Sequence, residues 1–183
     1  MREGIERAYS DLVTASGDDG NRDGLQATPA RAAEAFTFLT SGYRRAPATE
    51  FAVAAVPDES DQMISMKDIE LYSLCEHHLL PFFGHAHIAY IPNKSIVGFS
   101  NIPTLVDGFA HRLQIQERLT AQIATTVMEA LGAQGVGVVI EARHLCVMMR
   151  GVRKQRPVIR TSCMLGTFRT DSATRAEFLD LIQ

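Results

Sequence analysis

The stretch SLCEHHLLPFF, residues 73–83, holds a dense group of metal-binding side chains, and the rest of the chain is organised around it. Cys75, His77 and His78 lie within four positions, in a chain that contains three cysteines and six histidines. A C-x-x-H spacing lets a tight turn bring the Cys75 sulfur and a His78 ring nitrogen to one zinc ion. Two ligands do not complete such a site, so the sequence predicts further ligands from elsewhere.

The segment RHLC at residues 143–146 is the best source of a further ligand. It follows an apolar, β-branched stretch, and we predict one long strand over about residues 136–150. Side chains alternate along a strand, so His144 and Cys146 would share a face. Cys146 would then complete a Cys-His-Cys ligand set, and His144 would stand beside the metal without binding it.

A three-ligand set indicates a particular kind of metal chemistry. Three protein ligands leave a fourth position open for water, which distinguishes catalytic zinc from closed structural zinc. A free histidine within reach of that water is a natural proton shuttle. Spacing alone leaves two alternatives open, a structural zinc site and a core histidine with no metal.

Composition sets the broad class of protein. A chain of 183 residues is long enough to bury a sizeable core as one domain, with or without a helical appendage. The net charge of -3 gives no case for generic binding to nucleic acid or membranes, and no apolar run approaches membrane-spanning length. Residues 1–4 are not a secretory signal, and an odd number of cysteines favours a reducing cytoplasm over a disulfide framework.

Local patterns predict an α+β domain. Thr28 is expected to cap a helix with Pro29 in its first turn, while residues 45–61 are expected to form an exposed connection. The predicted domains are an N-terminal helical region with its connection at 1–60, and a catalytic domain at 61–183 with an antiparallel four-stranded sheet packed on helices. Helices are expected at 1–15, 28–42, after Asn101, at 115–132 and at 175–182, and strands at 63–71, 84–92, 136–150 and 157–168.

Several motifs, in this order, resemble the GTP cyclohydrolase I family. Its members are zinc enzymes that open the imidazole ring of GTP at C8 and form 7,8-dihydroneopterin triphosphate and formate, for pterin and tetrahydrofolate biosynthesis. The match runs from about residue 17 to the C-terminus. The matching stretches are GDDGNRDGL (17–25), TPAR (28–31), SLCEHHLLPF (73–82), HIAYIP (87–92), GFS (98–100), QIQERL (114–119) and HLCVMMRGVR (144–153).

The resemblance implies a role for each matching residue. The implied zinc ligands are Cys75, His78 and Cys146. The implied catalytic residues are His77, His144 and Ser100, with His144 expected to protonate the purine N7. The implied substrate-binding residues are Gln116 and Glu117 at the guanine, and Arg31 and Arg150 near the phosphates.

The resemblance also implies an assembly. Members of the family have the tunnelling fold, in which sheets join edge to edge into barrels. We therefore expect a cytoplasmic homo-oligomer, usually a decamer in this family, with active sites at subunit interfaces. The expected ligands are Zn²⁺ and a guanine nucleotide or related purine, with no nucleic acid and no membrane.

Three positions depart from the family pattern around the implied triphosphate site. Family members usually carry Lys after the serine that is Ser100 here, often Arg three residues later, and commonly Lys three residues after Arg31. This chain has Asn101, Thr104 and Glu34 at these positions. The loss of charge-assisted contacts favours a divergent paralogue that acts on a guanine-type purine with fewer or no phosphates. The alternative is that neighbouring cations compensate and GTP remains the substrate.

Two other classes of protein stay open on the sequence. One is a non-catalytic zinc or nucleotide-binding module with the same fold, which would not need His77, His144 and Glu117. The other is a tunnelling-fold reductase with a cysteine nucleophile and a nicotinamide cofactor. The CEHH and HLC motifs argue against the reductase.

Overall fold

In the computed structural model, which describes residues 2–183, the chain divides into two compact units. The first ends at Ser41, and the second is Gly42–Gln183. This division falls earlier than the predicted domain boundary at 60/61, and the assignment of a catalytic domain to 61–183 stays a prediction. Within the described residues, no helix combines the length and the apolar character needed to cross a membrane.

The N-terminal unit is a pair of helices, α1 (Arg2–Ala15) and α2 (Thr28–Leu39). The rings of Tyr9 and Phe36 meet edge to face across the pair, with centroids 6.3 Å apart. Both predicted helices are confirmed, but the predicted cap is wrong. Ala27 occupies the cap position, and the Thr28 hydroxyl instead donates to the Gly24 carbonyl inside the preceding turn.

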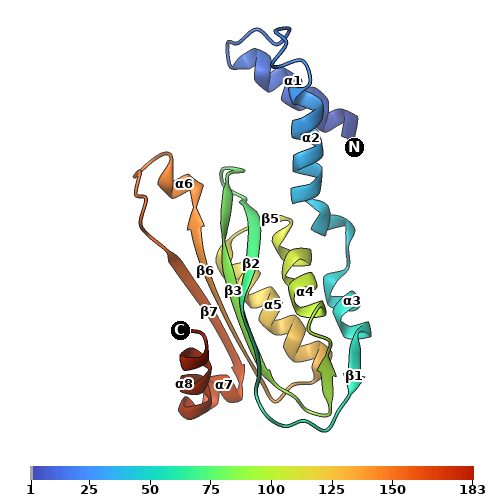
Figure 1. The fold of residues 1–183 in the computed structure, drawn as a ribbon, viewed down its shortest axis with the longest axis vertical. Helices are drawn as coiled ribbons and strands as arrows, with labels where there is room; N and C mark the ends of the chain where they lie inside the picture. The colour runs from blue at the N-terminus through green and yellow to red at the C-terminus, as the bar shows by residue number, and fades with distance from the viewer. Residues whose placement is uncertain (1) are drawn as a thin grey trace. The chain divides into compact units, whose positions relative to one another are not determined.

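The larger unit is built on a sheet in the order β5-β2-β3-β6-β7. Its four long strands are antiparallel, which confirms the predicted α+β architecture (Figure 1). A short strand that we did not predict, β5, adds to the edge of β2 in parallel, pairing Gln114 with Cys75. The strands are β2 (Ile64–Cys75), β3 (Pro81–Ile91), β5 (Leu113–Gln114), β6 (Gly135–His144) and β7 (Ile159–Gly166).

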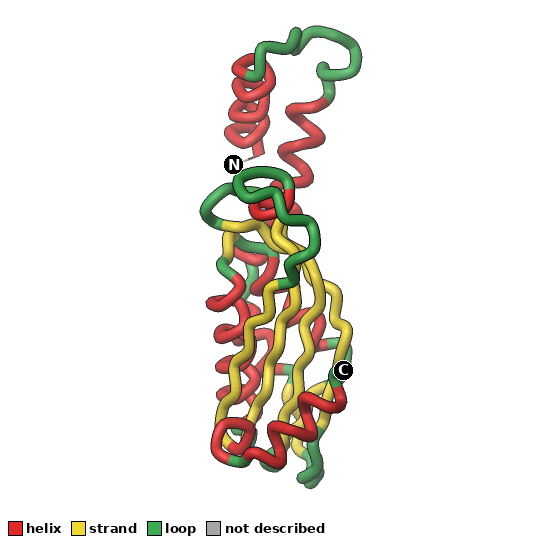
Figure 2. The backbone as a smooth tube through the Cα atoms, turned by 90° about the vertical axis from the view of Figure 1, so that its left-hand side faces the viewer, coloured by secondary structure: helices red, strands yellow, loops and turns green. Residues whose placement is uncertain are grey.

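Helices cover the sheet unequally on its two faces (Figure 2). The main core lies between one face and the helices α4 (Asn101–Ala110) and α5 (Gln116–Leu131). The helix α5 ends as predicted at Gly132, whose φ of +55° suits a residue without a side chain. On the other face, α7 (Thr167–Thr170) and α8 (Ser172–Leu181) pack Phe168 and Phe178 against the sheet.

The segment predicted to be an exposed connection is partly ordered into the core, so that prediction is wrong. It contains α3 (Pro47–Val53) and β1 (Ala55–Pro57), after a 3-10 turn at Ser41–Arg44. Phe51 is buried in the main core, and β1 pairs with β4 (Ser95–Val97) in a small second sheet. The alanines and prolines that suggested a loop suit a short helix with Pro47 in its first turn.

The predicted long strand over 136–150 is also wrong in its second half. Strand β6 ends at His144, and the short helix α6 (Leu145–Met148) follows directly. The last pair with β3 is Phe82 with His144, and the last pair with β7 is Ala142 with Ile159. Beyond these pairs neither neighbour continues the ladder, so the backbone groups find partners in a helical turn instead.

Candidate metal centre and active site

The turn between β2 and β3 positions the first two candidate ligands. The Cys75 amide donates to the Leu80 carbonyl at 2.9 Å, and the Cys75 carbonyl accepts from the amides of His78 and Leu79 at 3.3 and 2.8 Å. Leu79 takes a φ of +55°, which closes the turn at some cost for a residue with a branched side chain. The turn brings His78 Nδ1 to 4.0 Å from Cys75 Sγ.

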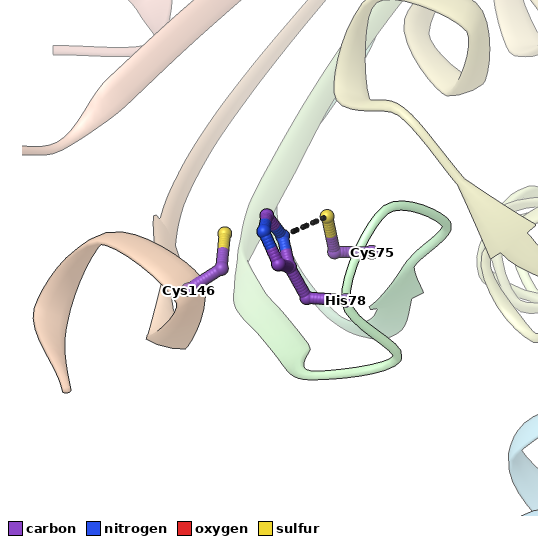
Figure 3. Close-up of side chains that lie close together, drawn as sticks. All are labelled: Cys75, His78 and Cys146. Atoms are coloured by element: carbon purple, nitrogen blue, oxygen red, sulfur yellow. Dashed lines mark hydrogen bonds between the residues drawn. The ribbon is translucent and has the colours of Figure 1, made fainter. Parts of the chain in front are cut away.

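Helix α6 brings the third candidate ligand to the same point. Cys146 lies in its single turn and faces Cys75 and His78 from the opposite side, as Figure 3 shows. One ligand atom from each of the three residues lies within 4.8 Å of the others. Donors around a tetrahedral zinc, with bonds of about 2.0–2.3 Å, are separated by roughly 3.5–3.8 Å. The three donors therefore fit zinc after a contraction of about half an ångström between Cys75 and His78, and of at most about 1 Å in the other two pairs.

The Cys146 thiol resists ionisation when no cation is bound. Burial raises the pKa of Cys146, the neighbouring Cys75 raises it further, and Arg150 acts in the opposite direction. A metal ion reverses this effect, because it binds and stabilises the thiolate form. Metal binding at this site must therefore release protons.

Two further histidines flank the candidate ligands. His77 Nδ1 lies 3.9 Å from Cys75 Sγ, and its side chain is 64% exposed. His144 is half-buried: its ring stacks on Phe82, with centroids 4.5 Å apart and planes inclined by 2°. Burial lowers the pKa of His144, and the carboxylate of Glu117 partly offsets this shift. The sequence around the ligands thus supplies one exposed imidazole, two residues after Cys75, and one half-buried imidazole, two residues before Cys146.

Gln116 fixes the orientation of His144. Its side chain is 2% exposed, and its amide nitrogen reaches three acceptors on β6 and β7: the carbonyls of Ile140 and Ile159 at 2.9 and 3.0 Å, and Thr161 Oγ1 at 3.1 Å. Carbonyl oxygens can only accept, so the Gln116 nitrogen is placed without ambiguity. Its Oε1 then accepts from His144 Nε2 at 2.9 Å. This bond places a proton on Nε2 and leaves Nδ1 as the free nitrogen.

The remaining predicted site residues are distributed over three places. Glu117, next to Gln116 on α5, is exposed, and its charge reaches His144. Arg150 is exposed after α6, close enough to affect Cys146. Arg31 lies on α2 in the N-terminal unit, and its role stays a prediction.

Ser100 lies far from the metal ligands within one chain. It precedes α4 at the end that follows β4, whereas the other end of α4 leads to β5 and so to Cys75. The ten residues of α4 span about 15 Å. The structure therefore brings together the three candidate ligands, both histidines and Glu117, but not Ser100.

The structure also shows a polar network that the sequence did not predict. Glu76, inside the ligand turn, forms an ion pair with Arg118 on α5, and Arg118 also contacts the side chain of Gln114. The partners are 42 residues apart in the chain, so no local pattern could have paired Glu76 with Arg118.

The fold and the site together define a class of protein: an α+β protein in which three zinc-type donors converge. The GTP cyclohydrolase I family model matches residues 5–183, nearly the whole chain. The chain therefore belongs to the GTP cyclohydrolase I family.

Curated relatives agree with this family. A protein named GTP cyclohydrolase 1 from Teredinibacter turnerae is 53% identical, and the match covers 95% of each chain. A protein of the same name from Pseudoalteromonas translucida is also 53% identical, and that match covers 100% of each chain. A third, from Leptospira biflexa, is 54% identical over 98% of each chain. A solved structure, the archaeosine synthase QueF-like protein in its apo form, aligns with 59% of this chain and 97% of that chain at 16% identity, with a TM-score of 0.47.

Proposed function

We propose that this enzyme hydrolyses the imidazole ring of GTP at C8 and forms 7,8-dihydroneopterin triphosphate and formate. The observation that carries the proposal is the convergence of Cys75, His78 and Cys146 beside an oriented His144. Membership of the family and the names of relatives at 53–54% identity support it.

In this proposal Cys75, His78 and Cys146 hold a zinc ion. A bound zinc ion supplies Lewis-acid activation of water at near-neutral pH, with one position left open by the three protein ligands. All three cysteines of the chain are free, as the expected cytoplasmic location requires.

His144 is the proposed proton donor to N7 of the purine. Its Nε2–H is held by Gln116, so the proton given to N7 is the Nδ1–H of the doubly protonated imidazolium, and the transfer leaves a neutral ring with Nδ1 unprotonated. The stacked Phe82 ring keeps the imidazole in one plane and excludes water from that side. His77, which is exposed and lies 3.9 Å from Cys75 Sγ, is assigned to later proton transfers, with Ser100.

Glu117 is the proposed recognition group for guanine. An exposed carboxylate at the start of α5 can accept hydrogen bonds from the ring N–H and the exocyclic amine of guanine. Adenine lacks the ring N–H donor and would leave one acceptor of the Glu117 carboxylate without a partner on the base. The neighbouring Gln116, also predicted at the guanine, has its side chain engaged inside the protein, so it supports recognition by fixing His144 and the start of α5.

The phosphate site decides between GTP and a less phosphorylated purine. Asn101 and Thr104, which stand where the family carries cations, line a cavity of about 110 Å³ together with Arg45, which is paired with Glu50. This arrangement places a guanidinium beside the two altered positions. Because Glu50 lines the same cavity and is paired with Arg45, the pair adds little net positive charge there; support for GTP as the substrate comes from the relatives named GTP cyclohydrolase 1, and Arg31 and Arg150 are the proposed phosphate contacts.

We propose a homo-oligomer whose active sites lie between subunits. Support comes from the position of Ser100, which is remote from the metal ligands of its own chain and so would reach a site only in a neighbouring subunit. A decamer built by joining sheets edge to edge is the form expected from the family.

The test is turnover by the metal-replete protein of GTP, GMP, guanosine and guanine, followed by formate release and mass spectrometry. Pterin triphosphate formed from GTP at micromolar KM is the expected result. Ring opening of GMP or guanosine without turnover of GTP would replace GTP by the less phosphorylated substrate. Absence of ring opening with all four, in protein that binds zinc, would favour a non-catalytic module.

A further inference from the structure

The turn that carries two of the candidate ligands is joined to helix α5 by one ion pair. The Glu76 carboxylate contacts Arg118 Nη2, and the Glu76 amide donates to the Gln114 carbonyl at 3.1 Å. The side chains of Glu76 and Arg118 are 34% and 41% exposed, so the pair is only partly screened by water. Glu76 lies directly between Cys75 and the pair of histidines.

Arg118 is itself held by a buried neighbour. Its Nε donates to Gln114 Oε1 at 2.9 Å, and its Nη2 donates to the Leu113 carbonyl at 3.0 Å. Gln114 is 2% exposed, and its Nε2 donates to the Phe109 carbonyl and to Gln122 Oε1, which fixes the amide orientation. The guanidinium is therefore placed by two contacts, to Gln114 and Leu113, before it meets Glu76, and a planar fork held in this way loses little entropy on pairing.

The ligand turn needs such a support. Its internal backbone hydrogen bonds all involve Cys75, and it includes Leu79 at a positive φ, a conformation that costs free energy for a residue other than glycine. Cys75 is anchored by the sheet through its pairing with Gln114, but His78 lies at the exposed end of the turn. An anchor at Glu76 restricts the part of the turn that carries His78.

We propose that Arg118 is a positioning residue for the metal centre. Through Glu76 it holds the turn in the conformation that points Cys75 and His78 toward Cys146. The turn then loses less conformational entropy when the metal binds. This inference rests on the proposed zinc site, not on the substrate. Groups that orient metal ligands generally contribute to metal affinity, and loss of this one should appear chiefly as faster zinc dissociation.

The experiment measures zinc affinity and zinc dissociation in the full-length protein by competition with a chromophoric chelator. The variants are Arg118→Gln, Glu76→Ala and the double variant. Each single change should weaken zinc binding about 3- to 10-fold. The double variant should lose no more zinc affinity than the single variant that binds zinc less tightly, because both changes remove the same contact. Arg118→Lys, which keeps the charge but not the fork, should lie between wild type and Arg118→Gln.

The matched control is Arg160→Gln, which breaks another partly exposed pair, with Glu141 on β6, away from the ligand turn. Its zinc affinity should equal that of wild type, and circular dichroism should show each variant folded. If Arg118→Gln does not fold, Glu76→Ala carries the test, because it alters only the turn side of the pair. Unchanged affinity in folded Glu76→Ala and Arg118→Gln, or fully additive losses, would overturn the inference. Absence of zinc from wild type would overturn it together with the proposed function.

Discussion

At the scale of single residues, His144 shows how neighbours decide what a side chain can do. Its Nε2 is committed to Gln116, its ring lies on Phe82, and burial lowers its pKa while Glu117 partly offsets that shift. The imidazole is thereby fixed in one orientation with Nδ1 available. A histidine two positions from a cysteine would otherwise be a candidate ligand in its own right.

The first prediction concerns this residue. His144→Ala should lower kcat for GTP by about 10²- to 10⁴-fold, the usual contribution of a general acid–base, while zinc content is unchanged. Rapid-quench or steady-state formate release, with zinc determined on the same sample, checks it. A variant that keeps zinc and normal kcat would remove His144 from the mechanism.

The second prediction concerns guanine recognition by Glu117. Glu117→Gln should lower kcat/KM for GTP by roughly 10- to 100-fold, because a charged hydrogen bond contributes about 1.5–3 kcal/mol. The control is Glu129→Gln, an equally exposed carboxylate on the same helix that lies three turns further along. Steady-state kinetics of both variants decide the point, and equal effects would argue that only the net charge of the helix matters.

At the scale of elements, the close approach of β3 and β6 sets the geometry of the site. Gly84 pairs with Ala142, two positions before Phe82 pairs with His144 in the same ladder. A Cβ at Gly84 would lie 1.9 Å from the Glu141 carbonyl oxygen, which is impossible without moving the backbone of β6. Strands β3 and β6 can therefore keep their observed separation at position 84 only if that residue is glycine.

The third prediction follows from that spacing. Gly84→Ala should lower the free energy of unfolding by about 1–3 kcal/mol or more, as overpacking does, and should weaken zinc binding by shifting the end of β6. Urea denaturation and zinc titration measure the two effects. Gly4→Ala is the control, since it sits in helix α1 with nothing within 4 Å of its added Cβ and should be neutral or slightly stabilising. Equal stability of the two variants would contradict the argument.

At the scale of the whole molecule, a buried histidine outside the site links stability to pH. His87 is 4% exposed, and its Nδ1 accepts from the Asp68 amide at 3.2 Å, which requires an unprotonated nitrogen. Burial lowers the pKa of His87, Asp68 and Glu141 act to raise it, and His85 and Lys67 act to lower it. The folded-state pKa lies below the unfolded value, so the unfolded chain binds the proton first. Stability is therefore full above about pH 6.5 and falls as pH drops toward the folded pKa.

The fourth prediction isolates this contribution. His87→Gln, which keeps an acceptor for Asp68, should flatten the loss of stability between about pH 7 and 5, by at most about 1.4 kcal/mol per pH unit. Urea midpoints across that range check it. His85→Gln, two positions away and exposed, should stay much closer to the wild-type curve, because it removes only one minor neighbouring charge and leaves the burial of His87 unchanged. If the two variants and wild type share one pH dependence, His87 is not the group that titrates.

Much of the site could be predicted from the sequence because its chemistry is local. The C-x-x-H spacing and the pairing of a later cysteine with a free histidine selected Cys75, His78, Cys146 and His144. The structure places the ligand atoms of the first three within 4.8 Å of one another and holds His144 through Gln116. Helical periodicity located α5, and alternation located the four long strands. A short motif specifies residue types and their spacing, and within a turn or a helix that spacing determines the relative positions of the side chains.

The sequence by itself determined the family, the donor atoms and the α+β order of elements. Only the tertiary structure decided that Cys146 sits on a helical turn where the strand pairing stops, that Gln116 orients His144, and that Arg118 reaches Glu76. It also showed that residues 45–61 contribute to the core, through Phe51. Each of these depends on partners far away in the chain, and propensities of a short segment contain no information about which distant groups will satisfy its backbone and side chains.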